Sequence, residues 1–205
     1  MFYYNNIVIS YYVNLFRYIP DWNFDISNNL IYNCTIFRYA FLKKNGGVIY
    51  YSPLFISEKP KNGLIKIHGG TLFDYYFVID KKMNGKQRTN FIIQQYLDGL
   101  LHLIEKYEND KKIKIRGTSY IKNKRTAEKI GFEIVETDIL QKIILIYNYF
   151  NILISNSIAK NKLSFPKLNK TKTFDADLSQ LLERKEYIKK LNKSLKNTIA
   201  NTVYN

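Results

Sequence analysis

KIKIRGTSYIKNKRTAEKIGFEIVET, residues 112–137, has the clearest local pattern in this chain of 205 residues. At its start, isoleucines alternate with lysine and arginine, which predicts a strand over Lys112–Ile121 with one buried face. Residues 122–130 predict a short helix that ends at Gly131, the residue type most common just beyond a helix. Phe132–Thr137 predicts the next strand, so the chain mixes strands with helices.

The residues upstream extend this pattern. Leu72–Asp80 is apolar on both faces except at Asp74, which is typical of a strand covered on both sides. A loop over Lys81–Thr89 then leads to a predicted helix over Asn90–Tyr107, whose apolar residues recur every three to four positions. A strand, a helix and a second strand in this order predict a parallel pair of strands at the centre of the sheet.

Further strands are expected on either side of this unit. Two β-rich runs joined by Asn45-Gly46-Gly47 predict a hairpin. The strands expected in addition to the central unit are Asn6–Tyr12, Thr35–Leu42, Val48–Tyr51, Leu64–His68 and Leu140–Tyr149. The expected fold is therefore α/β, with a mixed, mostly antiparallel sheet around a strand–helix–strand core.

The C-terminal part differs in composition. Residues 160–172 are polar, include Pro166 and predict a linker. Asp177-Leu178-Ser179-Gln180 resembles a capping box that opens a final helix. This helix has an apolar stripe opposite a basic face, so it either docks on the domain or binds a partner or a membrane surface. We expect a domain over residues 1–155, followed by a basic linker and helix over 156–205.

The net charge is +15, from 32 lysines and arginines against 17 acidic residues. It falls in two blocks, +8 over residues 81–131 and +7 over 155–205. Only six of the cations are arginine, the residue best suited to bidentate phosphate and base contacts, so nucleic acid is a possible but not a favoured partner. With 46% hydrophobic and 16% aromatic residues, the composition excludes a disordered chain.

Metal, disulfide and membrane signals are weak. A lone Cys34 predicts neither an internal disulfide nor a zinc site, and His68 and His102 are far apart, so we expect no metal centre and a cytoplasmic location. The apolar runs Met1–Ile19 and Ile139–Ile154 are interrupted by polar residues. Both are expected to be core segments, with no transmembrane segment in the chain.

Residues 115–136, with Lys-Ile-Gly-Phe opening the last strand, resemble the closing part of the GCN5-related N-acetyltransferase (GNAT) fold. The resemblance covers roughly a third of the chain, Leu72–Thr137. It implies that acetyl-CoA or another acyl-CoA binds with its pantetheine between the strands Leu72–Asp80 and Lys112–Ile121. The acyl group would pass to the amine of a small molecule or amino-sugar. The aromatic N-terminal third is a candidate acceptor pocket or homodimer face.

A loop that runs into a helix N-terminus suits a pyrophosphate, because backbone N–H groups and the helix dipole both attract it. The expected cofactor-binding residues are Asn84, Gly85, Lys86, Gln87, Arg88 and Thr89 in this loop, and Asn123 in the short helix. The candidate catalytic residues are Asp74, the one charge in an apolar stretch, His68 and Tyr120. Asp74 pairing with a lysine and a structural role for His68 are the alternatives.

Three positions depart from the family pattern. Gln87 and Thr89 stand where the family's phosphate loop has glycines, and Ala127 stands where a tyrosine often acts as general acid. These departures motivate a second hypothesis, a catalytically inactive interaction protein with a GNAT fold. A third hypothesis uses the two basic blocks to bind nucleic acid.

Overall fold

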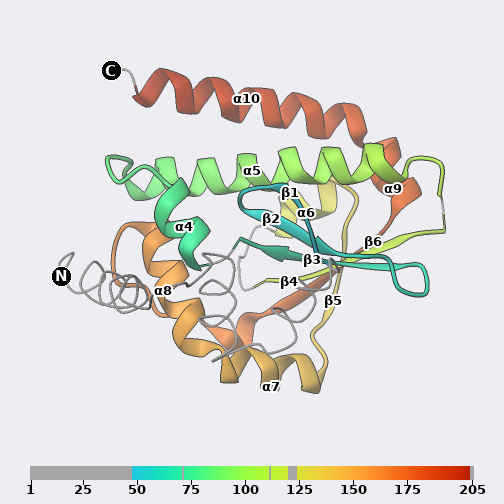
Figure 1. Cartoon of the computed structure of the whole chain (residues 1–205), viewed down its shortest axis with the longest axis horizontal. Helices are drawn as coiled ribbons and strands as arrows, with labels where there is room; N and C mark the ends of the chain where they lie inside the picture. The colour runs from blue at the N-terminus through green and yellow to red at the C-terminus, as the bar shows by residue number, and fades with distance from the viewer. Residues whose placement is uncertain (1–47, 71, 111, 120–123, 204–205) are drawn as a thin grey trace, which may run out of the picture.

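The computed structural model describes residues 48–70, 72–110, 112–119 and 124–203, and Figure 1 shows their arrangement. The strands predicted at Asn6–Tyr12 and Thr35–Leu42 lie outside these residues, as does Cys34. Six strands form one sheet: β1 (Val48–Ser52), β2 (Phe55–Glu58), β3 (Leu64–Gly69), β4 (Lys114–Ser119), β5 (Glu133–Glu136) and β6 (Lys172–Asp177). The helices are α4 (Leu72–Val78), α5 (Gly85–Tyr107), α6 (Lys124–Lys129), α7 (Ile139–Tyr147), α8 (Tyr149–Lys160), the 3₁₀ turn η1 (Leu168–Lys170), α9 (Leu178–Glu183) and α10 (Lys185–Val203).

The strand order across the sheet is β1-β2-β3-β4-β6-β5. Only β3 and β4 are parallel, and every other neighbouring pair is antiparallel. Since α4 and α5 connect the parallel pair, the predicted mixed, mostly antiparallel sheet with a strand–helix–strand core is confirmed. The first strand of that core is β3, however, and not residues 72–80.

Leu72–Asp80 was predicted to be a strand, and this prediction is wrong. The segment forms α4, whose Tyr75 is buried in a small apolar cluster between α4, α5 and α8, with Ile79 just beyond it. The strand predicted at Leu140–Tyr149 is wrong too, because these residues belong to α7 and α8. Short apolar runs have no period that separates a strand from a helix, so the surrounding contacts decide between them.

β6 was not predicted, and its residues begin where the polar linker was expected to end. It lies between β4 and β5, antiparallel to both. Two ion pairs follow its register with β4: the Arg116 guanidinium makes two hydrogen bonds of 2.7 and 2.6 Å to the Asp175 carboxylate, and Lys114 lies 3.5 Å from Asp177. A segment from the C-terminal part of the chain thus completes the sheet.

Helix α5 covers one face of the sheet, and α10 packs on the outer side of α5 (Figure 1). The main core lies between α5 and the sheet and includes the fully buried Ile65, Ile115 and Leu103. Gly99 in α5 lies against Phe55 of β2, and a Cβ atom there would be 2.5 Å from the ring. Close packing therefore explains the glycine in mid-helix.

The predicted capping box at Asp177 and the predicted helix end at Gly131 are confirmed, but the single final helix that was predicted is two helices, α9 and α10. Asp177 and Gln180 form the capping box of α9, and Gly131 follows α6 with φ of 103°, a value that suits only glycine. Leu181 and Ile188 of the predicted apolar stripe are fully buried. Within the described residues, no helix is long and apolar enough to cross a membrane.

Candidate cofactor-binding site

The candidate phosphate loop turns out to be the first turn of α5. The helix begins at Gly85, five residues earlier than predicted, because Asn84 caps it. The Asn84 side-chain oxygen accepts hydrogen bonds of 3.0 Å from the backbone N–H groups of Lys86 and Gln87. The Gln87 side chain in turn accepts from the backbone N–H of Asn84 at 2.7 Å. The N–H groups expected to hold a pyrophosphate are thus engaged by the chain's own capping box.

Arg88, predicted to bind phosphate, is instead a buried structural cation. Its guanidinium donates to three backbone carbonyls, those of Met83 at 2.9 Å, Ile158 at 3.0 Å and Lys81 at 2.9 Å. Burial lowers the pKa of Arg88 and outweighs the opposite effect of Asp80, but a guanidinium remains charged at neutral pH. Arg88 therefore ties the loop before α5 to the end of α8. The three donors in these contacts bind the protein's own backbone.

The end of α8 also closes one side of the α5 N-terminus. A Cβ atom on Gly85 would clash with the backbone carbonyl oxygen of Lys160. Glycine is needed at this position so that the two backbones can approach, which is a packing role and not the phosphate contact predicted from the sequence. Lys86 and Thr89 are exposed on the same helix turn, and the Thr89 hydroxyl donates to the Gly85 carbonyl at 2.8 Å.

The parallel strands open beyond their central residues. The pairing of β3 with β4 ends at Ile67 and Gly117. Yet β3 continues to Gly69, paired with β2, and β4 continues to Ser119, paired with β6. Two strands that each stay with an outer neighbour while losing each other must diverge. We call this divergence the β3–β4 opening. Pantetheine was expected between residues 72–80 and 112–121 instead, but residues 72–78 form helix α4.

Two tyrosine hydroxyls close the α5 side of this opening. The oxygens of Tyr75 from α4 and Tyr96 from α5 are 3.5 Å apart. Both lie against Gly69, where a Cβ atom would clash with the Tyr96 hydroxyl. Burial raises the pKa of Tyr96, more than the hydrogen bond with Tyr75 lowers it, so its hydroxyl stays protonated. Neither tyrosine was singled out from the sequence, where they are two of 18 tyrosines.

An apolar cluster separates the opening from the start of α5. Gly85 and Tyr96 are eleven residues apart on one helix, or about 16 Å along its axis. Between them, Ile92 packs in an apolar cluster that extends from the residue before β2 to the end of α8. The members of this cluster are Leu54, Tyr75, Ile79, Ile92, Ile154 and Ile158. Residues of α4 and α8 therefore pack against α5 between its first turn and Tyr96.

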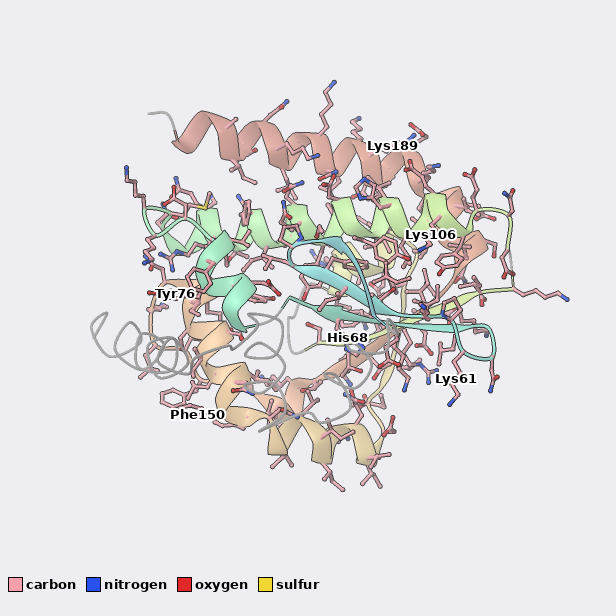
Figure 2. All side chains as sticks on the ribbon, in the orientation of Figure 1. Lys61, His68, Tyr76, Lys106, Phe150 and Lys189 are labelled. Atoms are coloured by element: carbon pink, nitrogen blue, oxygen red, sulfur yellow. The ribbon has the colours of Figure 1, made fainter. Side chains whose placement is uncertain are left out.

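The candidate catalytic residues are not brought together with the loop. Ile65 and Ile67 of β3 pack in the α5 core, so strand alternation puts His68 on the opposite face of the sheet, as Figure 2 shows. There its Nε2 atom is 3.3 Å from the Glu58 carboxylate on β2. Asp74 is half-buried on α4, not on a strand. Tyr120 and Asn123 lie outside the described residues.

Neither a metal site in the described residues nor a similarity to known proteins indicates a function. The described part of the chain contains no group of three or more His, Cys, Asp or Glu residues placed to hold a metal ion. Comparison with protein-family models, curated proteins and solved structures gave no match to the chain. The residues themselves are therefore the basis for a functional proposal.

Proposed function

We propose that this protein is a non-catalytic interaction protein built on a GNAT-like fold, in which the chain itself fills the position of an acyl-CoA. The strand order, with its single parallel pair and with β6 between β4 and β5, supports the fold. One observation supports the proposed loss of catalysis. The first turn of α5 is capped by Asn84 and Gln87, and α4 and α8 occupy the path from it to the strand opening.

A second candidate function is an acyl-CoA-dependent N-acyltransferase that acts on a small amine. The divergence of β3 and β4 after Ile67 and Gly117 favours it, because an opening between parallel strands is where a thioester arm would pair with strand backbone. In that case the Tyr96 hydroxyl, which lies against Gly69 at the end of β3, is the candidate proton donor. Displacing the Asn84 cap would cost about 1 kcal/mol, which a pyrophosphate could offset.

The two functions differ in ligand binding. We expect no change in the thermal unfolding of the full chain with millimolar acetyl-CoA, S-acetylpantetheine or adenosine 3′,5′-bisphosphate. An acyltransferase with a dissociation constant a hundredfold below the ligand concentration would be stabilised by about 2.7 kcal/mol, or roughly 5–10 °C. Isothermal titration calorimetry provides an independent measurement of the same binding.

Variants identify where any ligand sits. Lys86→Glu changes an exposed charge at the start of α5, and Lys189→Glu changes an exposed lysine on α10 as the matched control. Stabilisation by acetyl-CoA that is lost in Lys86→Glu but kept in Lys189→Glu would overturn the non-catalytic proposal. Stabilisation by S-acetylpantetheine as well would assign the thioester arm to the β3–β4 opening, and acetyl transfer to a panel of amines would then be measured.

A further inference from the structure

Helix α7 carries an apolar face that the described part of the chain leaves exposed. Ile139 is 77% exposed, Ile146 64% and Ile143 57%, with Leu140 and Phe150 similarly open to solvent. We call these five residues the α7 ridge. Residues 139–154 were expected to be a core segment. That holds for Ile154 of α8, which is buried, but is wrong for the ridge, because α7 packs chiefly against α8 and η1 among the described elements. An exposed apolar patch of this kind marks an interaction surface.

The ridge is convex and wide. Taking 3.6 residues per turn, the exposed apolar positions of α7 from Ile146 round to Ile144 span about 160° of the helix circumference. A single partner helix covers a narrower stripe than this. A fluid apolar medium covers any convex surface, so the shape of the ridge favours lipid over a protein groove.

Lys142 lies next to the ridge on α7, and two more exposed lysines belong to the neighbouring η1 segment. Lys142 is the only charged residue within α7 and is exposed, and η1, which packs against α7, contributes the exposed Lys170 with Lys167 just before it. Two carboxylates lie nearby, of which one is neutralised by an ion pair and the other keeps its charge while it caps α7. Glu136 forms an ion pair with Lys172, which lowers the pKa of that carboxyl group, and Asp138 caps α7 by accepting from the Gln141 N–H at 2.7 Å.

Other occupants fit this charge pattern less well. A two-fold dimer built on the ridge would bring Lys142 of both copies into one interface, and α7 contains no acidic residue to pair with them. Residues 1–47 contain four basic and two acidic residues, so that segment has no net negative charge to complement the lysines. Anionic lipid headgroups do complement them, and long lysine side chains can reach headgroups while their stems stay near the acyl chains.

We propose that the α7 ridge inserts into the interface of an anionic lipid membrane, with Lys142, Lys167 and Lys170 contacting the headgroups. The helix lies in the membrane surface and does not cross it. This surface is on the opposite side of the molecule from α10, as Lys189 and Phe150 show in Figure 2. It is also separate from the start of α5, so the inference holds for either candidate function.

The test is flotation of the full chain with vesicles of phosphatidylcholine, alone or with about 30% phosphatidylserine. We expect binding to the phosphatidylserine vesicles, and weaker binding at about 0.5 M than at about 0.1 M NaCl. Ile143→Glu combined with Ile146→Glu should reduce the bound fraction at least tenfold. Tyr187→Glu, at an exposed aromatic residue on α10, is the matched control and should bind as the unaltered chain does.

A second readout is independent of any loss of folding in the double variant. Leu140→Trp places a fluorophore on the ridge, and brominated lipids should quench its emission beyond the quenching seen for the unaltered chain, which has one tryptophan of its own. Absence of flotation at low salt, or equal flotation of the double variant with intact circular dichroism, would overturn the proposal. A dimer in light scattering that becomes a monomer in the double variant would assign the ridge to a second copy instead.

Discussion

Arg88 holds together three segments that are far apart in sequence. Its guanidinium is 6% exposed and donates to carbonyls of residues 81, 83 and 158. When the side chain is changed, all three carbonyls lose this donor, although the Ile158 carbonyl keeps a hydrogen bond of 3.2 Å from the Asn161 N–H. A buried acceptor left without a hydrogen bond is costly. The residue predicted to bind a cofactor is thus a determinant of stability.

Arg88→Met should lower the free energy of unfolding by about 2–4 kcal/mol, because each lost hydrogen bond to a charged donor costs about 1.5 kcal/mol or more. Arg88→Lys should recover only part of this, since one ammonium cannot reproduce the planar fork of donors. Urea unfolding followed by circular dichroism measures both. Lys86→Met, two residues earlier and exposed, is the control, and an equal loss in that variant would contradict the structural role of Arg88.

The start of α5 shows what sequence reasoning could have found. Asn84 followed three residues later by Gln87 is a capping-box pattern, which predicts a helix start at residue 85 without reference to any family. The same residues were interpreted as a phosphate loop because of the resemblance. One carbonyl partner of Arg88, that of Ile158, comes from α8, and this contact across 70 residues of sequence is one that no local pattern reveals.

At the scale of elements, a polar network fastens α10 to α5. Asn192 is buried and accepts from Gln94 at 3.1 Å while it donates to Asp98 at 3.0 Å, and Lys196 donates to the same Asp98 oxygen at 2.9 Å. Partial burial raises the pKa of Asp98, but the hydrogen bonds from Lys196 and Asn192 and nearby positive charges outweigh it. The net effect is a pKa below the ordinary value of 3.8.

A lowered carboxyl pKa means that Asp98 stabilises the fold when ionised. This contribution is present above about pH 4, the ordinary pKa, and is lost as the pH falls through the lower pKa of the folded state. Asp98→Asn should therefore cost about 1 kcal/mol at pH 7, and the difference from the unaltered chain should shrink between about pH 5 and pH 3. Unfolding at several pH values measures it. Glu183→Gln, at an exposed site on α9, should leave stability unchanged; a pH-independent loss in Asp98→Asn would exclude the ionic contribution.

The elements differ in how far the sequence predicts them. Strand β4, helix α6 and strand β5 follow from alternation and from Gly131, since each has a clear local period or stop signal. The runs 72–80 and 139–149 have isoleucines, phenylalanines and tyrosines in no decisive period, and packing against α5 and α8 makes them helical. β6 reads KTFDAD, a polar segment whose central place depends on ion pairs with β4.

At the scale of the whole molecule, β6 is the strand that joins β5 to the sheet formed by β1 to β4. A chain that ends at residue 171 lacks the strand between β4 and β5, so both lose their antiparallel partner together with the Arg116–Asp175 ion pair. We expect it to lose cooperative urea unfolding and near-ultraviolet circular dichroism. A chain that ends at residue 196, short of the last turns of α10, should keep both. Cooperative unfolding of the shorter chain would contradict a single sheet.

The position of β6 also bears on how the protein is made. Thirty-six positions separate the end of β5 at Glu136 from the start of β6 at Lys172. At about 5–20 residues per second, a ribosome takes roughly 2–7 s to add them. During that interval β4 and β5 each have an edge with no partner, and the lysine and arginine of one and the glutamates of the other discourage pairing with foreign chains. Between the synthesis of β5 and that of β6 the nascent chain therefore has unpaired strand edges that can aggregate, and a chaperone that acts at this stage would protect them.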